Sequence, residues 1–98
     1  MGKKKRKAAE ILPFCYYCER EFESETVLLN HQRARHYKCE TCGKRINNAP
    51  GMIQHCLQMH KVELREVPNS LPGRSDPTIM IVGSNGIPQS ILDAHYGL

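Results

Sequence analysis

Apolar positions along this chain predict two short, similar helical units in its first two thirds. Phe22 and Leu28 are spaced to fill the small core of the first unit, and Ile46 and Met52 take the same roles in the second. Tryptophan is absent, and aromatic residues make up only 6% of the 98 positions. Units this small bury little apolar surface, so we expect them to need metal ions or disulfides to hold together.

Cap residues indicate where the two helices begin and end. Ser24 is a suitable N-cap for the first helix, and Asn47 or Asn48 can cap the second, whose first turn tolerates Pro50. The KVELRE run that follows the second helix consists largely of helix formers. We therefore predict that this helix extends to about Glu66.

The pattern changes after the second unit. Residues 67–77 are rich in proline and turn formers and are interpreted as a linker. TIMIV, at residues 78–82, predicts a short strand, and the GSNG that follows predicts a turn. SILDAHY then predicts a short helix that Gly97 can terminate.

One strand and one helix cannot form a core alone. We expect residues 78–98 to be a docking segment that orders against the two units or against a partner; the alternative is the disordered start of a longer tail. His95 has no candidate ligands near it in the sequence, so we expect it to be a plain surface histidine.

Cysteine and histidine occur in both units at one repeated spacing, C-x2-C-x12-H-x4-H. The two quartets are Cys15, Cys18, His31 and His36, and Cys39, Cys42, His55 and His60. Two thiols on a tight turn with two imidazoles about one helical turn apart are the ligand set of structural zinc. A catalytic zinc site keeps one position open, whereas each quartet supplies four ligands. The sequence thus predicts two structural Zn²⁺ ions, in a first finger at residues 13–36 and a second at 37–66.

Other uses of the cysteines fit less well. A disulfide framework is disfavoured because the count of five is odd and no secretory signal is visible, and a redox C-x-x-C would need a surrounding βαβ pattern. Cys56 points about 100° away from His55 around the helix, so we expect a free thiol that packs with Met52 or Met59.

Sequence features of an enzyme or of a membrane protein are not found. No Ser-His-Asp set, paired carboxylates or glycine-rich phosphate loop can be assembled, so neither catalysis nor a small-molecule substrate is expected. No run approaches the ~20 apolar residues of a membrane span, so we expect no membrane partner.

Positive charge is concentrated at the start of the chain, where a basic run exceeds the whole net charge of +4. The run consists of Lys3, Lys4, Lys5, Arg6 and Lys7. We expect residues 1–12 to be a disordered basic tail that serves nuclear import, contacts nucleic acid, or both; the alternative is a solvated end with neither role.

The fingers themselves are almost neutral, with six basic and five acidic side chains between residues 13 and 60. Because phosphate neutralisation dominates affinity for DNA, such a pair is a poor DNA clamp on its own. Basic residues near the junction of the fingers are nevertheless candidates for contact with a partner or nucleic acid. They are Arg33, Arg35, Lys38, Lys44 and Arg45.

The ligand spacing resembles that of the C2H2 zinc-finger family, which implies tandem ββα fingers. In DNA-reading members three positions of each helix touch successive bases. Those positions hold Ser24, Val27 and Asn30 in the first finger, and Asn48, Gly51 and Gln54 in the second. Asparagine and glutamine can pair with adenine, but no arginine is placed to read guanine, so DNA is the less favoured partner.

The junction between the fingers also departs from the DNA-reading pattern. Only Tyr37 and Lys38 separate His36 from Cys39, whereas DNA-reading arrays use a longer linker. Tyr37 occupies the place of an aromatic core residue of the second finger. We therefore expect the two fingers to sit in a fixed relation.

Several longer stretches together resemble the BuGZ family. They are GKKKRK, FCYYCEREF, HQRARHYKCETC, GMIQHCLQMHK, VPNSLPGR and the later GIP. The resemblance implies that both ligand quartets and the short junction carry over. It also implies a protein that is nuclear in interphase, binds spindle microtubules and the checkpoint protein Bub3, and associates with splicing factors. A plant relative is similar in its fingers and acts as a transcriptional activator.

One difference from the family limits which of its properties the resemblance implies for this chain. Family members continue into a long proline-rich tail, where the animal proteins have their Bub3-binding motif, so this chain is expected to be a fragment or a short member. Bub3 binding is therefore assigned to no residue here. We predict a non-enzymatic nuclear module that binds proteins, RNA or both in a splicing or spindle assembly; the alternative is a DNA-binding transcription factor.

Overall fold

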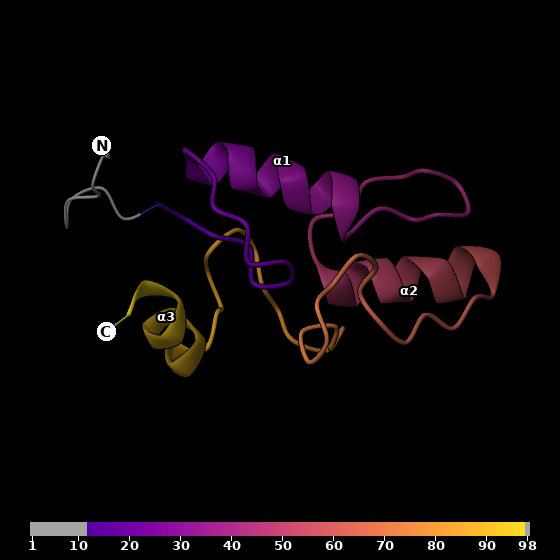
Figure 1. Ribbon diagram of the computed structural model, residues 1–98. Coiled ribbons are helices and arrows are strands. Elements are labelled where there is room, and N and C mark those ends of the chain that lie inside the picture. The colour runs from indigo at the N-terminus through magenta and orange to yellow at the C-terminus, as the bar shows by residue number, and fades with distance from the viewer. Residues whose placement is uncertain (1–11, 98) are drawn as a thin grey trace.

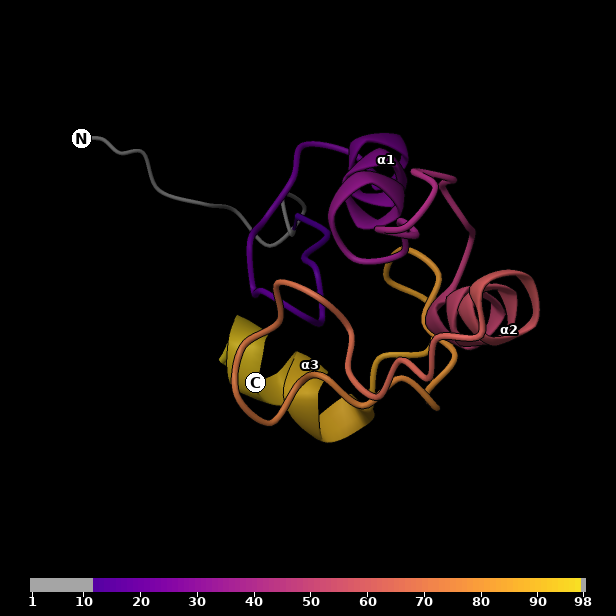
Figure 2. The same cartoon turned by 90° about the vertical axis from the view of Figure 1, so that its right-hand side faces the viewer.

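The computed structural model describes residues 12–97 and contains three helices in this range (Figure 1). They are α1 (Glu25–Arg35), α2 (Ala49–His60) and α3 (Gln89–Tyr96). Helices α1 and α2 run in similar directions, and α3 lies roughly crosswise to them (Figures 1 and 2). The turn that precedes α1 lies between α1 and α3 in both views. The basic run of residues 3–7, with its expected disorder, lies outside the described residues.

Strand pairing in the fingers is minimal. Within residues 12–97 it is limited to isolated antiparallel bridges, one in each finger and one in the docking segment: Phe14 with Glu21, Lys38 with Arg45, and Val82 with Asn85. The prediction of complete ββα fingers is therefore not confirmed. Each finger consists of a turn closed by a single bridge and followed by one helix.

Polar side chains begin both finger helices, as their sequence predicted. The Ser24 hydroxyl accepts a hydrogen bond from the Val27 amide at 3.3 Å, and the Asn48 side chain accepts one from the Gly51 amide at 2.7 Å. Each cap satisfies an amide that has no partner inside the helix. Of the two asparagines proposed for the second cap, Asn48 is the one used.

The predicted extension of the second helix to about Glu66 is wrong. Helix α2 ends at His60, because Lys61 adopts a left-handed conformation with a φ of 58°. The Lys61 and Val62 amides bond back to carbonyls of the last turn, and Leu64 then packs against the core of the second finger. Tertiary packing thus overrides the helix propensity of the KVELRE run.

The main core joins the first finger to residues that follow the second finger. Its buried members are Phe14, Cys15, Tyr16, Tyr17, Leu28, Tyr37, Ala49, Val67, Ile81 and Ile87. A smaller cluster of Cys39, Met52 and Cys56 fills the second finger, with Ile46 and Leu64 packed against it. Tyr37, expected to belong to the second finger, is therefore part of the main core instead.

The predicted strand at 78–82 is also wrong. Gly83 and Gly86 have positive φ angles of 64° and 97° and reverse the chain there, which confirms the GSNG turn. Near the end of this segment, backbone groups of Ile81 and of the nearby Gly83 bond to finger side chains instead of to a neighbouring strand. The Ile81 carbonyl accepts a hydrogen bond from the Tyr37 hydroxyl at 2.6 Å, and both backbone groups of Gly83 bond to the Gln32 side chain.

The GSNG turn docks closely on α1. Glu25 accepts hydrogen bonds from the backbone amide and the hydroxyl of Ser84, both at 2.8 Å. Gly83 lies so near that any side chain there would overlap the Glu25 carboxylate. Further along, α3 ends at Gly97 with a φ of 76°, as predicted. Residues 81–97 therefore form part of the folded unit together with the first finger.

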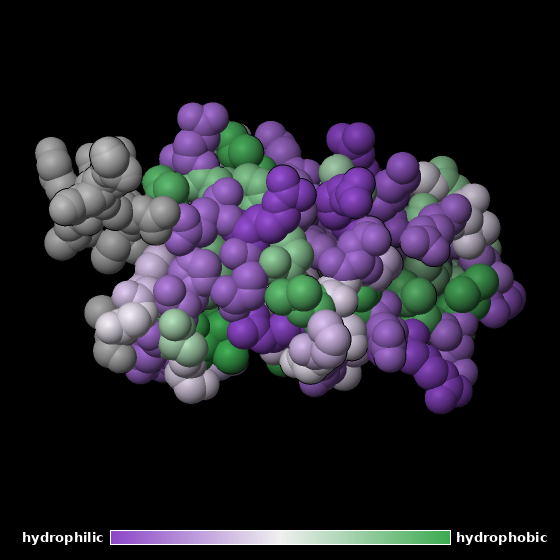
Figure 3. Space-filling model, viewed as in Figure 1, coloured by the Kyte–Doolittle hydropathy of each residue, from purple (hydrophilic) through white to green (hydrophobic). Residues whose placement is uncertain are grey.

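The surface shown in Figure 3 is largely hydrophilic over α1, whereas apolar side chains gather over α2. Exposed apolar residues there include Leu57 and Met59 of α2 and Val62 just beyond it. Among residues 12–97, no helix has the length and apolar character that are required to cross a membrane.

We expect the Tyr37→Phe substitution to reduce the free energy of unfolding by about 1–3 kcal/mol, because the buried Ile81 carbonyl loses its donor. Denaturant unfolding of the metal-loaded chain measures the effect. Tyr16→Phe is the matched control, since the Tyr16 hydroxyl makes no hydrogen bond within residues 12–97. Equal effects of the two substitutions would contradict the prediction.

Candidate metal centres

The first quartet converges on one point between the turn and the end of α1. Cys15 and Cys18 come from the turn, His31 comes from α1, and His36 caps its C-terminus. The Nε2 atom of His31 lies 3.4 Å from the Cys18 Sγ atom and 3.1 Å from the His36 Nε2 atom. One donor atom from each residue lies within 4.8 Å of the others.

The second quartet is built in the same way but is more open. Its donor atoms also lie within 4.8 Å of one another, with the Cys42 Sγ and His55 Nε2 atoms 3.3 Å apart. Cys42 is exposed, whereas its counterpart Cys18 is half-buried. Cys39 is buried in the small core, and His55 and His60 come from α2.

Both quartets fit a tetrahedral metal ion. Metal–ligand bonds of about 2.0 Å to nitrogen and 2.3 Å to sulfur separate tetrahedral donors by roughly 3.3–3.8 Å, close to the distances observed here. The Nε2 atom of His60 is buried and has no hydrogen-bond partner among the described residues, which is unusual for a buried polar atom. A bound metal would satisfy that atom. The Cys2His2 donor set is consistent with zinc, and it leaves no open position for catalysis.

Burial favours the uncharged form of both the histidine and the cysteine ligands, and this has opposite consequences for metal binding. Burial, with His36 nearby, lowers the pKa of His31 to about 4, so this imidazole is neutral and ready to bind at pH 7. Burial raises the pKa of the Cys15 thiol to about 12. Because the thiolate is the metal ligand, the cation must displace a proton there.

The fixed orientation of His36 depends on a residue that the sequence analysis did not single out. The Nδ1–H group of His36 donates a hydrogen bond to the Pro68 carbonyl at 2.8 Å, and this leaves Nε2 directed at His31. Such outer contacts fix the tautomer and the ring orientation of a metal-binding histidine. Pro68 belongs to residues 67–77, which were interpreted only as a linker. A backbone carbonyl leaves no motif in the sequence.

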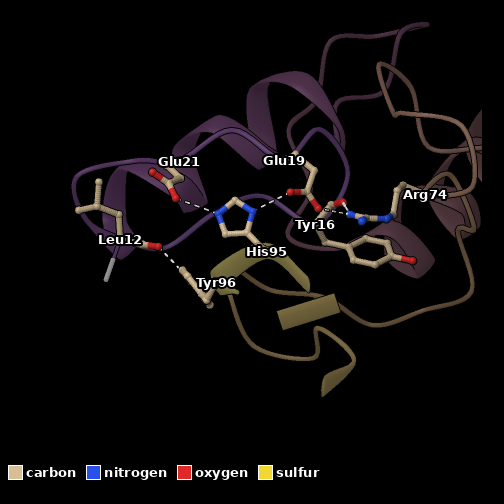
Figure 4. A network of polar contacts seen from close by, with 7 residues as sticks. All are labelled: Leu12, Tyr16, Glu19, Glu21, Arg74, His95 and Tyr96. Atoms are coloured by element: carbon tan, nitrogen blue, oxygen red, sulfur yellow. Dashed lines mark hydrogen bonds and ion pairs between the residues drawn. The ribbon is translucent and has the colours of Figure 1, made fainter. Parts of the chain in front are cut away.

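A polar network ties the first turn to residues far along the chain (Figure 4). Glu19 directly follows the ligand Cys18, and its carboxylate bonds to Arg74 at 2.7 Å and to the His95 Nδ1 atom at 2.6 Å. Burial acts to raise the pKa of Glu19, but the hydrogen bonds from His95 and Arg74 lower it overall. Nearby, the Tyr96 hydroxyl donates to the Leu12 carbonyl.

The expectation that His95 is a plain surface histidine is wrong. Its side chain is 11% exposed, and its Nε2 atom bonds to Glu21 at 2.8 Å. The ring also stacks on Phe14, with 3.7 Å between the centroids. Folding brings α3 against the first finger, and nothing near His95 in the sequence reveals these partners.

A comparison of the two fingers contains the signal that was missed. Glu19 has a φ of 66°, a conformation that glycine adopts most readily. Its counterpart after Cys42 is Gly43, with a φ of 80°. A glutamate at a position suited to glycine indicates that its side chain has a specific role.

The candidate contact residues divide into two groups. Lys3, Lys4, Lys5, Arg6 and Lys7 lie outside the described residues. Lys38, Lys44 and Arg45 are exposed on the turn of the second finger, while Arg35 is exposed and Arg33 half-buried near the end of α1. Arg20, next to the first metal centre, is a further exposed cation that was not singled out.

Cys56 is a free thiol, as predicted, and it is buried. It packs with Met52, whereas Met59 is 68% exposed. Its thiol donates a weak hydrogen bond to the Cys39 Sγ atom at 3.8 Å. Cys56 is not among the four donors that converge on the second centre.

Comparison of the sequence with those of known proteins identifies relatives of this chain. No family model matches the chain. It is 50% identical, over 99% of its length, to the protein SUPPRESSOR OF FRI 4 of Arabidopsis thaliana. It is 44% and 43% identical, over 95% of its length, to the human and Xenopus laevis proteins named BUB3-interacting and GLEBS motif-containing protein ZNF207. The chain spans 26% of the plant protein and 19% and 20% of the two vertebrate proteins.

The paired Cys2His2 centres define a zinc-finger type of protein, with metal sites suited to a structural role. Over the region that it spans, the chain belongs to the family of ZNF207 and SUPPRESSOR OF FRI 4, as its sequence motifs predicted. These relatives are named for interactions or genetic effects, and nothing in their names points to catalysis.

Zinc uptake by the metal-free chain should release protons, because a cysteine must become a thiolate to bind the ion and its thiol is protonated at neutral pH before zinc folds the finger. The apparent zinc affinity should therefore rise with pH through the neutral range. Titration calorimetry in buffers of different ionisation enthalpy measures the number of protons released. An affinity independent of pH, with no proton release, would contradict this.

Proposed function

We propose that this region is a non-enzymatic interaction module of the nucleus that is stabilised by structural zinc ions. It binds proteins, RNA or both within a large assembly of the splicing or spindle machinery. Two structural zinc ions hold its shape, and its basic surface provides the contact. The homology to ZNF207, a protein named for an interaction, supports a binding role. BUB3 binding itself is assigned to none of these residues.

The observation that carries this proposal is a pair of opposed cations. Lys38 and Arg45 face each other across the bridge of the second finger, and both are exposed. Like charges directly opposite one another on paired strands are destabilising. The equivalent bridge of the first finger pairs Phe14 with Glu21 instead. An anionic partner would relieve the repulsion that this arrangement imposes.

Two neighbouring hollows extend the basic surface. One, of about 360 Å³, is lined by the cations Arg35 and Lys38 and by one acid, Glu40. Asn69 also lines it. A smaller one, of about 110 Å³, shares Arg35 and Asn69 and reaches Arg20 beside the first metal centre. Within residues 12–97 these three cations have no ion-pair partner. Phosphate or carboxylate groups of a partner fit such a surface.

The alternative, sequence-specific reading of DNA, is supported by three exposed helix residues, Val27, Asn30 and Gln54. It is weakened by the caps, because Ser24 and Asn48 occupy base-reading positions but use their side chains on their own helices. Few side chains remain to discriminate bases. DNA binding therefore stays the second candidate.

Capture from nuclear extract by the zinc-loaded chain, with and without nucleases, separates these functions. Retention of splicing or spindle proteins after RNase and DNase treatment supports the protein-binding role, and loss with RNase alone supports an RNA-bound role. Loss with DNase alone would favour the transcription-factor function over the proposed one.

Replacing Arg33, Arg35 and Lys38 together with alanine should weaken this capture several-fold while the zinc content stays at two ions. The substitutions remove positive charge but no metal ligand. Arg65→Ala is the control, because Arg65 is an exposed cation already paired with Glu63. Unchanged capture by the triple variant would refute the assignment of this surface.

A further inference from the structure

The two metal centres share a ligand spacing but differ in their surroundings. The second finger repeats the first at a constant interval, so each position in one has a counterpart in the other. Counterparts that differ in chemistry include Glu19 with Gly43, Glu21 with Arg45, and Gln32 with Cys56. In the first finger these three side chains bind Arg74, His95 and Gly83. In the second finger their counterparts make no such contact with residues 67–97.

The ligand histidines of the two centres also differ in their hydrogen bonds to residues 67–97. His36 donates through Nδ1 to the Pro68 carbonyl at 2.8 Å. Among the four ligand histidines, and within residues 12–97, it alone makes a hydrogen bond through the ring nitrogen that faces away from the other donors. The next residue, Asn69, anchors Pro68, because its side-chain amide donates to the Arg35 carbonyl at 2.8 Å.

The turn of the first centre is also held from outside. Glu19 follows the ligand Cys18 in a left-handed conformation that is unfavourable for a residue with a side chain. Arg74 pairs with one oxygen of its carboxylate, and His95 bonds to the other (Figure 4). Gly43 adopts the same conformation at the second centre without needing such support.

The ligands of the first centre are also less exposed to solvent than those of the second. The first centre has two buried and two half-buried ligands, whereas in the second Cys42 is exposed and both histidines are half-buried. Solvent and competing chelators therefore reach the second centre more easily. Outer contacts of this kind are worth about 10- to 100-fold in metal affinity.

We propose that residues 67–97 form an outer shell for the first metal centre, so that the first centre holds its ion more tightly and the second releases its ion first. Glu19 and Asn69 act as positioning residues in this shell. The inference rests on the proposed binding of two zinc ions. It makes the second finger the part of the module that responds to zinc supply.

The test is a stepwise titration of the zinc-loaded full chain with EDTA, followed by residue-resolved ¹H–¹⁵N NMR. The amide of Gly43 reports the second centre, and that of Glu19 reports the first. We expect the Gly43 signal to change with the first equivalent of zinc removed and the Glu19 signal to change only later. Simultaneous changes, or an earlier change at Glu19, would overturn the inference.

Two variants test the outer shell itself. Glu19→Ala keeps a side chain in the left-handed conformation, with its φ of 66°, but removes the carboxylate that Arg74 and His95 hold. Asn69→Gly removes the side-chain contact with Arg35 but suits the φ of 62° at this position. Each should weaken zinc binding at the first centre about 10- to 100-fold, leaving the second unchanged. In Asn69→Gly the resonance of the His36 Nδ1 proton should also shift. Glu23→Gln is the control, since Glu23 is an exposed acid of the same finger.

The outcomes also separate the inference from the proposed function. Equal weakening of both centres by either variant would indicate general destabilisation and overturn the outer-shell role. A chain that holds fewer than two zinc ions before any EDTA is added would overturn the two-zinc module and this inference with it. Two ions lost together would overturn the inference alone.

Discussion

The constraint on which this structure depends is the convergence of two thiols on a turn with two imidazoles at the end of the following helix. Each finger has one isolated bridge and one helix, and the core of the second contains only Cys39, Met52 and Cys56 as buried members. So little apolar surface cannot stabilise a fold. Zinc binding at such sites contributes roughly 10–16 kcal/mol, which is the scale that folding of each finger requires.

Around this repeated unit the chain builds an asymmetric structure. The main core gathers Tyr17 and Leu28 of the first finger, Tyr37 of the junction, and Val67 and Ile81 from beyond the second finger. The Tyr37 hydroxyl connects these layers through the Tyr17 hydroxyl and the Ile81 carbonyl. Residues 67–97 thereby pack against the first finger and extend its core.

The polar side chains of the two fingers are also used differently. Acidic and amide side chains of the first finger, such as Glu19 and Gln32, are used within the chain. Basic side chains of the second, such as Lys38 and Arg45, have no ion-pair partner among residues 12–97. A nearly neutral pair of fingers can thus present a locally basic face. Under the proposed function, an anionic partner would bind this small basic face.

Features that depend on near neighbours could be predicted from the amino-acid sequence. They are the two ligand quartets, the caps at Ser24 and Asn48, the GSNG turn and the end of α3 at Gly97. These follow from spacing and backbone preference, which local residues set. Long-range packing was needed to show that α2 ends at His60, that residues 78–82 form no strand, and that Pro68 and His95 contact residues of the first centre. Each of those outcomes depends on groups distant in sequence, including backbone carbonyls that have no residue signature, so only the folded chain brings them together.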